Sequence, residues 1–99
     1  MRIPKKFKLF ATTVNVIFDS SRMVNEEILG ESDYTLGVIT LSEKRKADSM
    51  PEDAILDTFY HEKVHMILDA MHERELSSNE DFVEVFSKLL RQADETSEY

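Results

Sequence analysis

The first part of the chain shows the alternation that is typical of β-strands. Residues 7–19 read FKLFATTVNVIFD and are rich in β-branched and aromatic residues. Within this segment Val14, Val16 and Phe18 alternate with Thr, Asn and Ile, so that one face of a strand is apolar throughout. The pattern predicts two short antiparallel strands with a turn or bulge at residues 11–13.

A third strand is predicted at residues 37–42 (GVITLS), directly after the turn-forming segment 30–36. The two glycines of the chain bracket this segment, where a tight backbone turn would use them. We expect a short helical turn within residues 20–29 and a charged loop at residues 43–50. The first half of the chain therefore predicts a small three-stranded sheet, antiparallel or mixed.

The second half changes to a helical pattern. Ser49, Pro51 and Glu52 form a typical helix start, with a cap, a first-turn proline and a capping-box glutamate. A central helix over residues 51–73 follows, and its apolar residues cover more than one stripe, so it should pack on both the sheet and a neighbour. After a connection at 76–78, a second amphipathic helix is indicated by apolar residues at three- and four-residue spacing: Phe82, Val83, Phe86, Leu89, Leu90 and Ala93.

These elements predict one α+β domain over residues 1–99, with a sheet packed on a central helix and a second C-terminal helix. Residues 1–50 form the sheet half, residues 51–94 form the two-helix half, and residues 95–99 form a frayed tail. A chain of 99 residues is long enough for one hydrophobic core and too short for a second domain.

Charge and composition narrow the function classes. The net charge is -8, of which residues 1–50 contribute +1 and residues 51–99 contribute -9. Such an acidic chain is not expected to bind nucleic acid, which requires Lys and Arg to neutralise phosphates. No apolar run is long enough for a membrane span, and no secretory signal is apparent, so a cytoplasmic protein is expected. The absence of cysteine leaves His, Asp and Glu as metal ligands.

The central helix carries the sequence His61-Glu62-Lys63-Val64-His65, an H-E-x-x-H motif. Residues i and i+4 of a helix lie ~40° apart around its axis, so both imidazoles can reach one zinc ion. Glu62 would lie beside the metal, where its carboxylate can accept a proton from an activated water. The alternative is a pair of histidines on a helix face that hydrogen bond to carboxylates such as Asp57 or Asp69.

A zinc site of this kind needs a third protein ligand. His72 lies two turns beyond His65, ~10 Å along the helix axis, so it is a poor ligand and is expected on the surface. Glu80, at the start of the second helix, is the preferred third ligand, with Asp81 or Glu84 as alternatives. Residues 77–80 also match a capping box, in which Glu80 would only satisfy backbone donors at the helix start.

Three carboxylates are candidates to orient the ligand histidines by accepting their free ring N–H. Glu84 lies one turn after Glu80 on the second helix, and Asp57 and Asp69 lie four residues outside the two histidines. Solvent exposure is the other possibility for both aspartates.

The motif His61-Glu62-x-x-His65, followed by Glu80 on a second helix, resembles the gluzincin branch of zinc metallopeptidases. In particular, it resembles the very small metallopeptidase domains encoded in bacteriophages and bacteria. The resemblance implies a minimal zincin-like fold, one zinc ion per chain held by His61, His65 and Glu80, and Glu62 as the general base. It also implies that the strand before the helix, at Val38, Ile39, Thr40 and Leu41, aligns an extended polypeptide substrate by β-addition.

Two departures from that family are visible. The segment between His65 and Glu80 is shorter than in large gluzincins, and no histidine or tyrosine stands where an oxyanion stabiliser is expected. Besides a zinc peptidase, the sequence permits a non-catalytic zincin-like protein-binding module with a structural or vestigial metal site. A metal-free α+β interaction domain is a third reading. A phage-encoded chain would act in the cytoplasm of the bacterial host.

Overall fold

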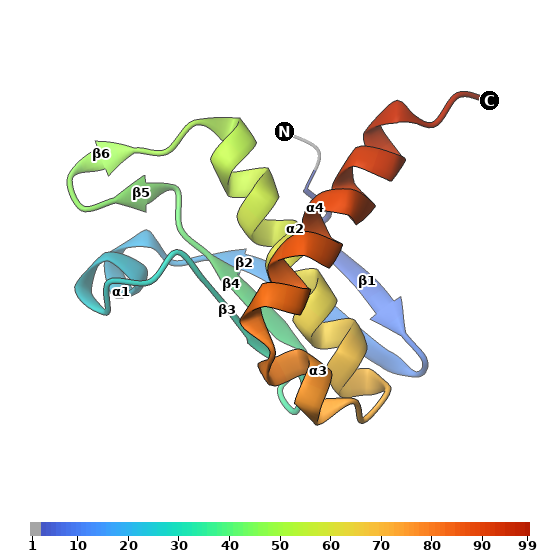
Figure 1. Cartoon of the computed structure of the whole chain (residues 1–99). Coiled ribbons are helices and arrows are strands. Elements are labelled where there is room, and N and C mark those ends of the chain that lie inside the picture. The colour runs from blue at the N-terminus through green and yellow to red at the C-terminus, as the bar shows by residue number, and fades with distance from the viewer. Residues whose placement is uncertain (1–2) are drawn as a thin grey trace.

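The computed structural model describes residues 3–99 and shows an α+β fold (Figure 1). The mixed sheet has four strands: β1 (Lys6–Leu9), β2 (Thr12–Phe18), β3 (Gly30–Asp33) and β4 (Val38–Leu41). A separate hairpin is formed by β5 (Lys44–Arg45) and β6 (Asp48–Ser49). The helices are α1 (Ser20–Asn25), α2 (Glu52–Ala70), α3 (Arg74–Ser78) and α4 (Glu80–Thr96). No helix within residues 3–99 combines the length and the apolar character that crossing a membrane requires.

The strand order β1-β2-β4-β3 corrects the predicted sheet. β4 pairs in parallel with β2 and antiparallel with β3, so it lies inside the sheet. The prediction that Val38, Ile39, Thr40 and Leu41 form the edge that binds a peptide is therefore wrong, because both sides of this strand are already paired. The edge strand beside β4 is β3, which the sequence pattern had placed in a turn.

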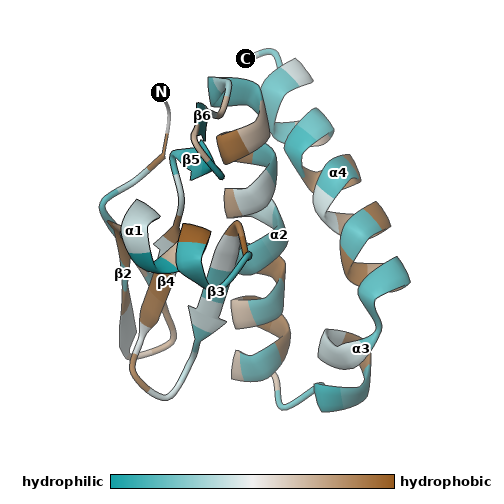
Figure 2. Ribbon diagram, turned by 90° about the vertical axis from the view of Figure 1, so that its left-hand side faces the viewer, coloured by the Kyte–Doolittle hydropathy of each residue, from teal (hydrophilic) through white to brown (hydrophobic). Residues whose placement is uncertain are grey.

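The helix α2 is the central layer of the molecule, with the sheet on one side and α4 on the other (Figure 2). A first cluster of buried side chains joins the sheet to α2: Val14, Val16, Ile39, Leu41, Ile55, Phe59 and Met66. A second, smaller cluster joins α2 to Val83 of α4 through Val64 and Leu68. The prediction of a central helix that packs on both a sheet and a second helix is confirmed.

The helix ends differ from the predictions in detail. The helix α2 begins at Glu52, with Pro51 as an N-cap that offers no side-chain hydrogen bond. The predicted cap, Ser49, instead pairs with Lys44 in the β5–β6 hairpin, so the charged loop is a hairpin. At the other end of the chain α4 continues to Thr96, two residues beyond the predicted boundary at residue 94.

His72 terminates α2 and lies on the surface, as predicted. Its φ of 60° is left-handed, and the amides of His72 and Glu73 donate to the carbonyls of Asp69 and Leu68, at 3.0 and 2.9 Å. This is the Schellman arrangement, in which glycine usually occupies the left-handed position. The role of His72 is to end the helix.

Candidate metal centre

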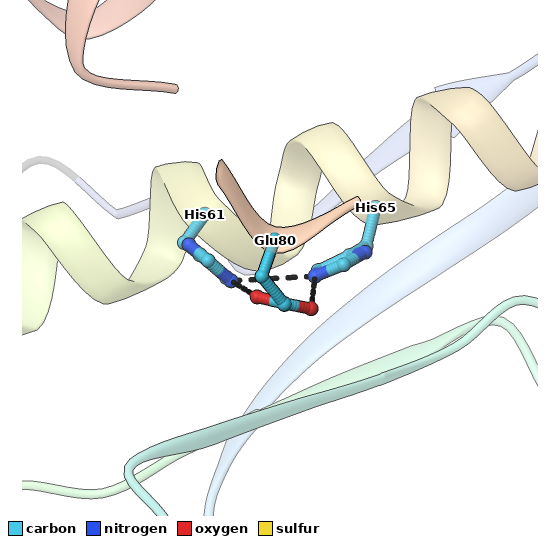
Figure 3. A group of neighbouring side chains, drawn as sticks. All are labelled: His61, His65 and Glu80. Carbon is cyan, nitrogen blue, oxygen red and sulfur yellow. Dashed lines mark hydrogen bonds and ion pairs between the residues drawn. The ribbon is translucent and has the colours of Figure 1, made fainter. Parts of the chain in front are cut away.

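The two histidines of the motif lie one turn apart on α2 and point in the same direction (Figure 3). Their Nε2 atoms are 3.3 Å apart, and both rings are largely shielded, with side-chain exposures of 21% for His61 and 14% for His65. Nitrogen atoms at this distance either share an N–H···N hydrogen bond or bind one metal ion, because two lone pairs would otherwise face each other.

Glu80 brings a carboxylate to the same point from α4. Its Oε2 lies 3.1 Å from Nε2 of His61, and its Oε1 lies 3.2 Å from Nε2 of His65 (Figure 3). Asn79 is the N-cap of α4 and accepts a hydrogen bond from the amide of Phe82, so Glu80 is not needed as a cap. The capping-box alternative is wrong, because Ser77 lies within α3.

The spacing of these atoms fits a tetrahedral zinc ion. Nitrogen and oxygen ligands ~2.0–2.1 Å from zinc, at tetrahedral angles, lie about 3.3 Å from one another. The two Nε2 atoms lie 3.3 Å apart; Oε2 of Glu80 lies 3.1 Å from the His61 nitrogen, and Oε1 lies 3.2 Å from the His65 nitrogen. His61, His65 and Glu80 thus form a group whose ligand atoms lie within 4.8 Å of one another. Asp81, an alternative third ligand, is exposed in the first turn of α4.

The second nitrogen of each ring has a polar partner that fixes the ring orientation. Nδ1 of His61 lies 3.2 Å from Oε2 of Glu84, and Nδ1 of His65 lies 3.1 Å from Oγ of Ser77. With the protons on Nδ1, these contacts leave both Nε2 lone pairs free for a metal. The lysine Lys88 pairs with Glu84 at 2.8 Å and, as the largest cause, lowers the pKa of that carboxyl.

Glu84 thus contacts His61 as predicted, whereas Ser77 was considered only as a helix cap. Asp57 contacts Arg91 at 3.6 Å, and Asp69 lines a cavity with His72 and Arg74. The orienting role predicted for the two aspartates is filled by Glu84 and Ser77.

The carboxylate of Glu62 is buried between α2 and β3, and only 9% of the residue is exposed. Burial raises the pKa of Glu62, and the nearby His65 and His61 and a hydrogen bond with Ser32 offset part of that effect. A carboxylate in this position is poised to take up a proton more readily than one in water.

Gly30 makes this position of Glu62 possible. A Cβ atom at residue 30 would lie 2.6 Å from Cγ2 of Thr58 and 3.1 Å from Cγ of Glu62. The sequence pattern predicted a turn at this glycine, but here it lets β3 approach α2 closely. Ser32, two residues further along the same strand, was missed because a polar strand residue has no distinctive sequence signal.

The strand β3 presents free backbone groups beside this site. The amide of Ser42 donates to the carbonyl of Leu29 at 3.0 Å. Because hydrogen-bonded pairs alternate along an antiparallel ladder, the backbone groups of residues 29, 31 and 33 point toward β4. The N–H and C=O groups of Gly30 and Ser32 are therefore directed away from the sheet, toward the open edge.

Two cavities flank the His61–His65–Glu80 group along β3. One, of about 350 Å³, is lined by Gly30, Thr58, Glu62 and Glu84 among others. The second, of about 550 Å³, is lined by Ser32, Tyr34, Asp69, His72 and Ser77 among others. Together with the edge strand, they make the surroundings of the candidate metal centre an open groove.

Tyr60, which was expected in the core, packs partly against it, and its hydroxyl donates to Asp94 at 2.8 Å.

Comparisons of the chain with protein family models, curated proteins and solved structures find no match. The functional assignment therefore depends on the geometry of the site.

Proposed function

We propose that this chain is a zinc-dependent metallopeptidase of the gluzincin type, with zinc held by His61, His65 and Glu80. The observation that carries the proposal is the convergence of three side chains: the two Nε2 atoms lie 3.3 Å apart, and the nearest carboxylate oxygens of Glu80 lie 3.1 and 3.2 Å from them. The orienting contacts of Glu84 and Ser77 support it, because they leave both Nε2 atoms free to bind a metal.

Zinc held by His61, His65 and Glu80 would supply the Lewis acid that polarises a peptide carbonyl and lowers the pKa of a water molecule. Glu62 accepts a proton from that water, and its raised pKa makes the protonated state accessible. The same carboxyl then donates the proton to the leaving amine. Burial of Glu62 beneath β3 keeps its carboxyl in one place for both transfers.

The substrate would be a polypeptide in an extended conformation, bound along β3. The outward amide and carbonyl groups of Gly30 and Ser32 can pair with such a segment by β-addition. This assignment moves the substrate-binding edge from β4 to its neighbour β3. Flexible polypeptides are the favoured substrates, because only a flexible segment can extend along β3 in the open groove.

The proposal is tested by zinc analysis and by cleavage of an unfolded polypeptide such as reduced casein. Zinc should bind at about one ion per chain and raise the thermal stability, because it binds the folded state only. Glu62→Gln should keep the zinc and lower the cleavage rate by about 10²- to 10⁴-fold. The matched control is Glu43→Gln, at an exposed position outside the groove.

Equal cleavage by the Glu62→Gln variant would refute the mechanism. Zinc binding without cleavage by the unmodified chain would favour the non-catalytic binding module, with a structural metal. Absence of zinc binding would overturn both and favour a metal-free interaction domain.

A further inference from the structure

The four-stranded sheet has two open edges, and they lie on opposite sides of the sheet (Figure 1). One is β3, which borders the candidate groove. The other is β1, which within residues 3–99 pairs with β2 alone. The backbone N–H and C=O groups along an open edge can pair with a further strand, so both edges can bind one.

The hydrogen bonds of β1 show which of its backbone groups are open. The amide of Val16 donates to the carbonyl of Lys5 at 2.9 Å, and hydrogen-bonded pairs alternate along an antiparallel ladder. The backbone groups of residues 5, 7 and 9 therefore point toward β2. Those of Lys6 and Lys8 point away from the sheet, so alternate residues are open at this edge, as they are at β3.

The side chains at the two edges carry opposite charges on the same face of the sheet. Val14 and Ile39 point toward the core, and their cross-strand partners Phe7 and Ser32 share that face. Side chains alternate along a strand, so the charged residues of both edges point to the sheet face turned away from α2. These residues are Lys6 and Lys8 on β1, and Glu31 and Asp33 on β3.

The basic charge of the β1 edge is not compensated within the chain. Lys6 and Lys8 are exposed, and neither has an ion-pair partner within residues 3–99. Their cross-strand neighbours on the same face are Asn15 and Thr13, which are uncharged. This edge is therefore a basic surface in a chain whose net charge is -8.

The β3 edge keeps a negative charge even though one of its carboxylates has a partner. Glu31 pairs with Arg22 at 3.0 Å, but Asp19 and Glu26 share the same guanidinium. Three carboxylates around one cation leave this corner of the molecule negative. Asp33 accepts a hydrogen bond from a turn amide at 3.0 Å and has no ion-pair partner within residues 3–99.

The directions of the strands allow the two edges to pair between copies. Both β1 and β3 are antiparallel to their neighbours, and those neighbours, β2 and β4, are parallel to each other. The two edge strands therefore run in the same direction. A second copy placed edge to edge in the same orientation would continue the sheet with a parallel pair, and its α2 would lie on the same side.

The open backbone groups fix the register of such a pair. In a parallel ladder, a residue bonds to the two residues that flank the one opposite it. Lys6 would bond to Gly30 and Ser32 of the second copy, because these residues have the outward groups, and would lie opposite Glu31. Two residues further along, the second lysine meets the second carboxylate. Side chains of directly opposite residues lie ~5 Å apart at Cβ, within reach of an ion pair.

We propose that the chain associates head to tail, with β1 of one copy adding to β3 of the next. Hydrogen-bond pattern, strand direction, sheet face and charge all match in this pairing. Two β1 edges would bring lysines together, and two β3 edges would bring carboxylates together, so pairing between like edges is disfavoured. Because unlike edges pair, each assembly keeps one free edge at either end and can grow beyond a dimer.

The association would also regulate the proposed peptidase, and this consequence rests on the proposed function. The next copy would occupy the outward groups of Gly30 and Ser32, which are the groups that would hold a substrate. The cleavage rate per chain should therefore fall as the protein concentration rises.

The association is tested by sedimentation velocity of the full chain in the presence of chelator, so the result does not depend on zinc. Concentrations run from about 10 μM to about 1 mM, the range suited to a small interface. The mean sedimentation coefficient should rise with concentration at ~0.1 M ionic strength, and the rise should be smaller at ~1 M.

A charge exchange tests the register. Lys6→Glu and Glu31→Lys should each weaken the association by about tenfold, because each places like charges opposite one another. An equimolar mixture of the two variants should associate again, because the acidic position 6 of one variant then faces the basic position 31 of the other. The matched control is Lys44→Glu, an exposed lysine of the separate β5–β6 hairpin, which should leave the association unchanged.

A sedimentation coefficient that is independent of concentration would overturn the proposal. So would a mixture of the two variants that associates no better than either alone, or a Lys44→Glu variant that associates as weakly as Lys6→Glu. Growth that stops at a dimer would contradict it as well, because a closed dimer joins like surfaces. Association without peptide cleavage at any concentration would support the head-to-tail pairing and refute only the proposed peptidase.

Discussion

The two long helices show how differently a hydrophobic pattern can relate to burial. The helix α2 has buried residues on two sides, because the sheet covers one side and α4 covers another. The helix α4 has a much more one-sided pattern, yet Val85, Phe86 and Leu89 are exposed. The helix with the clearer apolar stripe therefore contributes less to the core.

The reason lies in the site between the two helices. Glu80 and Glu84 must face His61 for the observed contacts to form, and both lie on the polar side of α4. Turning that side inward necessarily turns Phe86 and Leu89 outward. A strong stripe thus identifies a helix reliably, but the site decides which side faces the molecule.

The largest expected effect is on the free energy of unfolding, which a substitution in α2 should lower far more than one in α4. Phe59 of α2 is 2% exposed and belongs to the main core cluster, so Phe59→Ala should lower the free energy of unfolding by about 3–5 kcal/mol. Leu89→Ala, on the exposed side of α4, should change it by less than about 0.5 kcal/mol. Urea unfolding of the two variants measures both values. A cost for Leu89→Ala similar to that for Phe59→Ala would contradict the exposed position of this side.

Much of the fold follows from local patterns. The strands β1, β2 and β4, the short helix α1 and both long helices were predicted, because alternation and 3.6-residue periodicity reflect burial directly. The strand β3 was missed because its sequence, Gly-Glu-Ser-Asp, has no apolar residue and is typical of a turn. It is a strand because its backbone pairs with β4 in a hairpin, and backbone pairing does not require the apolar alternation by which a strand is predicted.

A smaller effect is expected where β3 approaches α2. Gly30→Ala places a methyl group 2.6 Å from Cγ2 of Thr58 and should destabilise the chain by about 1–3 kcal/mol. Thr58→Ser removes that Cγ2 while keeping a hydroxyl that can donate to the carbonyl of Ala54. In the double variant part of the loss should be recovered, which denaturant unfolding of all four chains would show. Strict additivity of the two changes would mean that Gly30 does not limit the approach of the strand.

The candidate site was predictable where residues lie on one helix. His61, Glu62 and His65 are placed by helix geometry alone, and Glu80 followed from the need for a third ligand. Gly30, Ser32 and Ser77 could not be assigned their roles, because each acts through a contact between elements. Asp57 and Asp69 were chosen by spacing along α2, whereas the orienting partners come from α3 and α4.

The contacts from α3 and α4 predict the next effect, which concerns zinc affinity. Glu84→Ala and Ser77→Ala each remove the partner of a ligand Nδ1 and should weaken zinc binding by about 10- to 100-fold. Asp57→Ala and Asp69→Ala are the matched controls and should change the affinity little. Competition with a chelating dye measures all four. A larger loss from either aspartate variant would restore the orienting role first predicted for α2.

The smallest effect concerns the pH dependence of the zinc-free chain. Burial between α2 and β3 raises the pKa of Glu62 above its usual value of 4.5, so folding favours the protonated carboxyl. The stabilisation from this group is complete below the pKa of the unfolded chain and is lost as the pH rises through the folded pKa. Glu62→Gln removes this loss, so its stability relative to the unmodified chain should increase from acidic to neutral pH. Urea unfolding in the presence of chelator, with Glu43→Gln as an exposed control, measures this difference. If the difference in free energy of unfolding between Glu62→Gln and the unmodified chain stays constant with pH, the Glu62 carboxylate is exposed to water. That result would weaken the contrast between the buried side of α2 and the exposed side of α4.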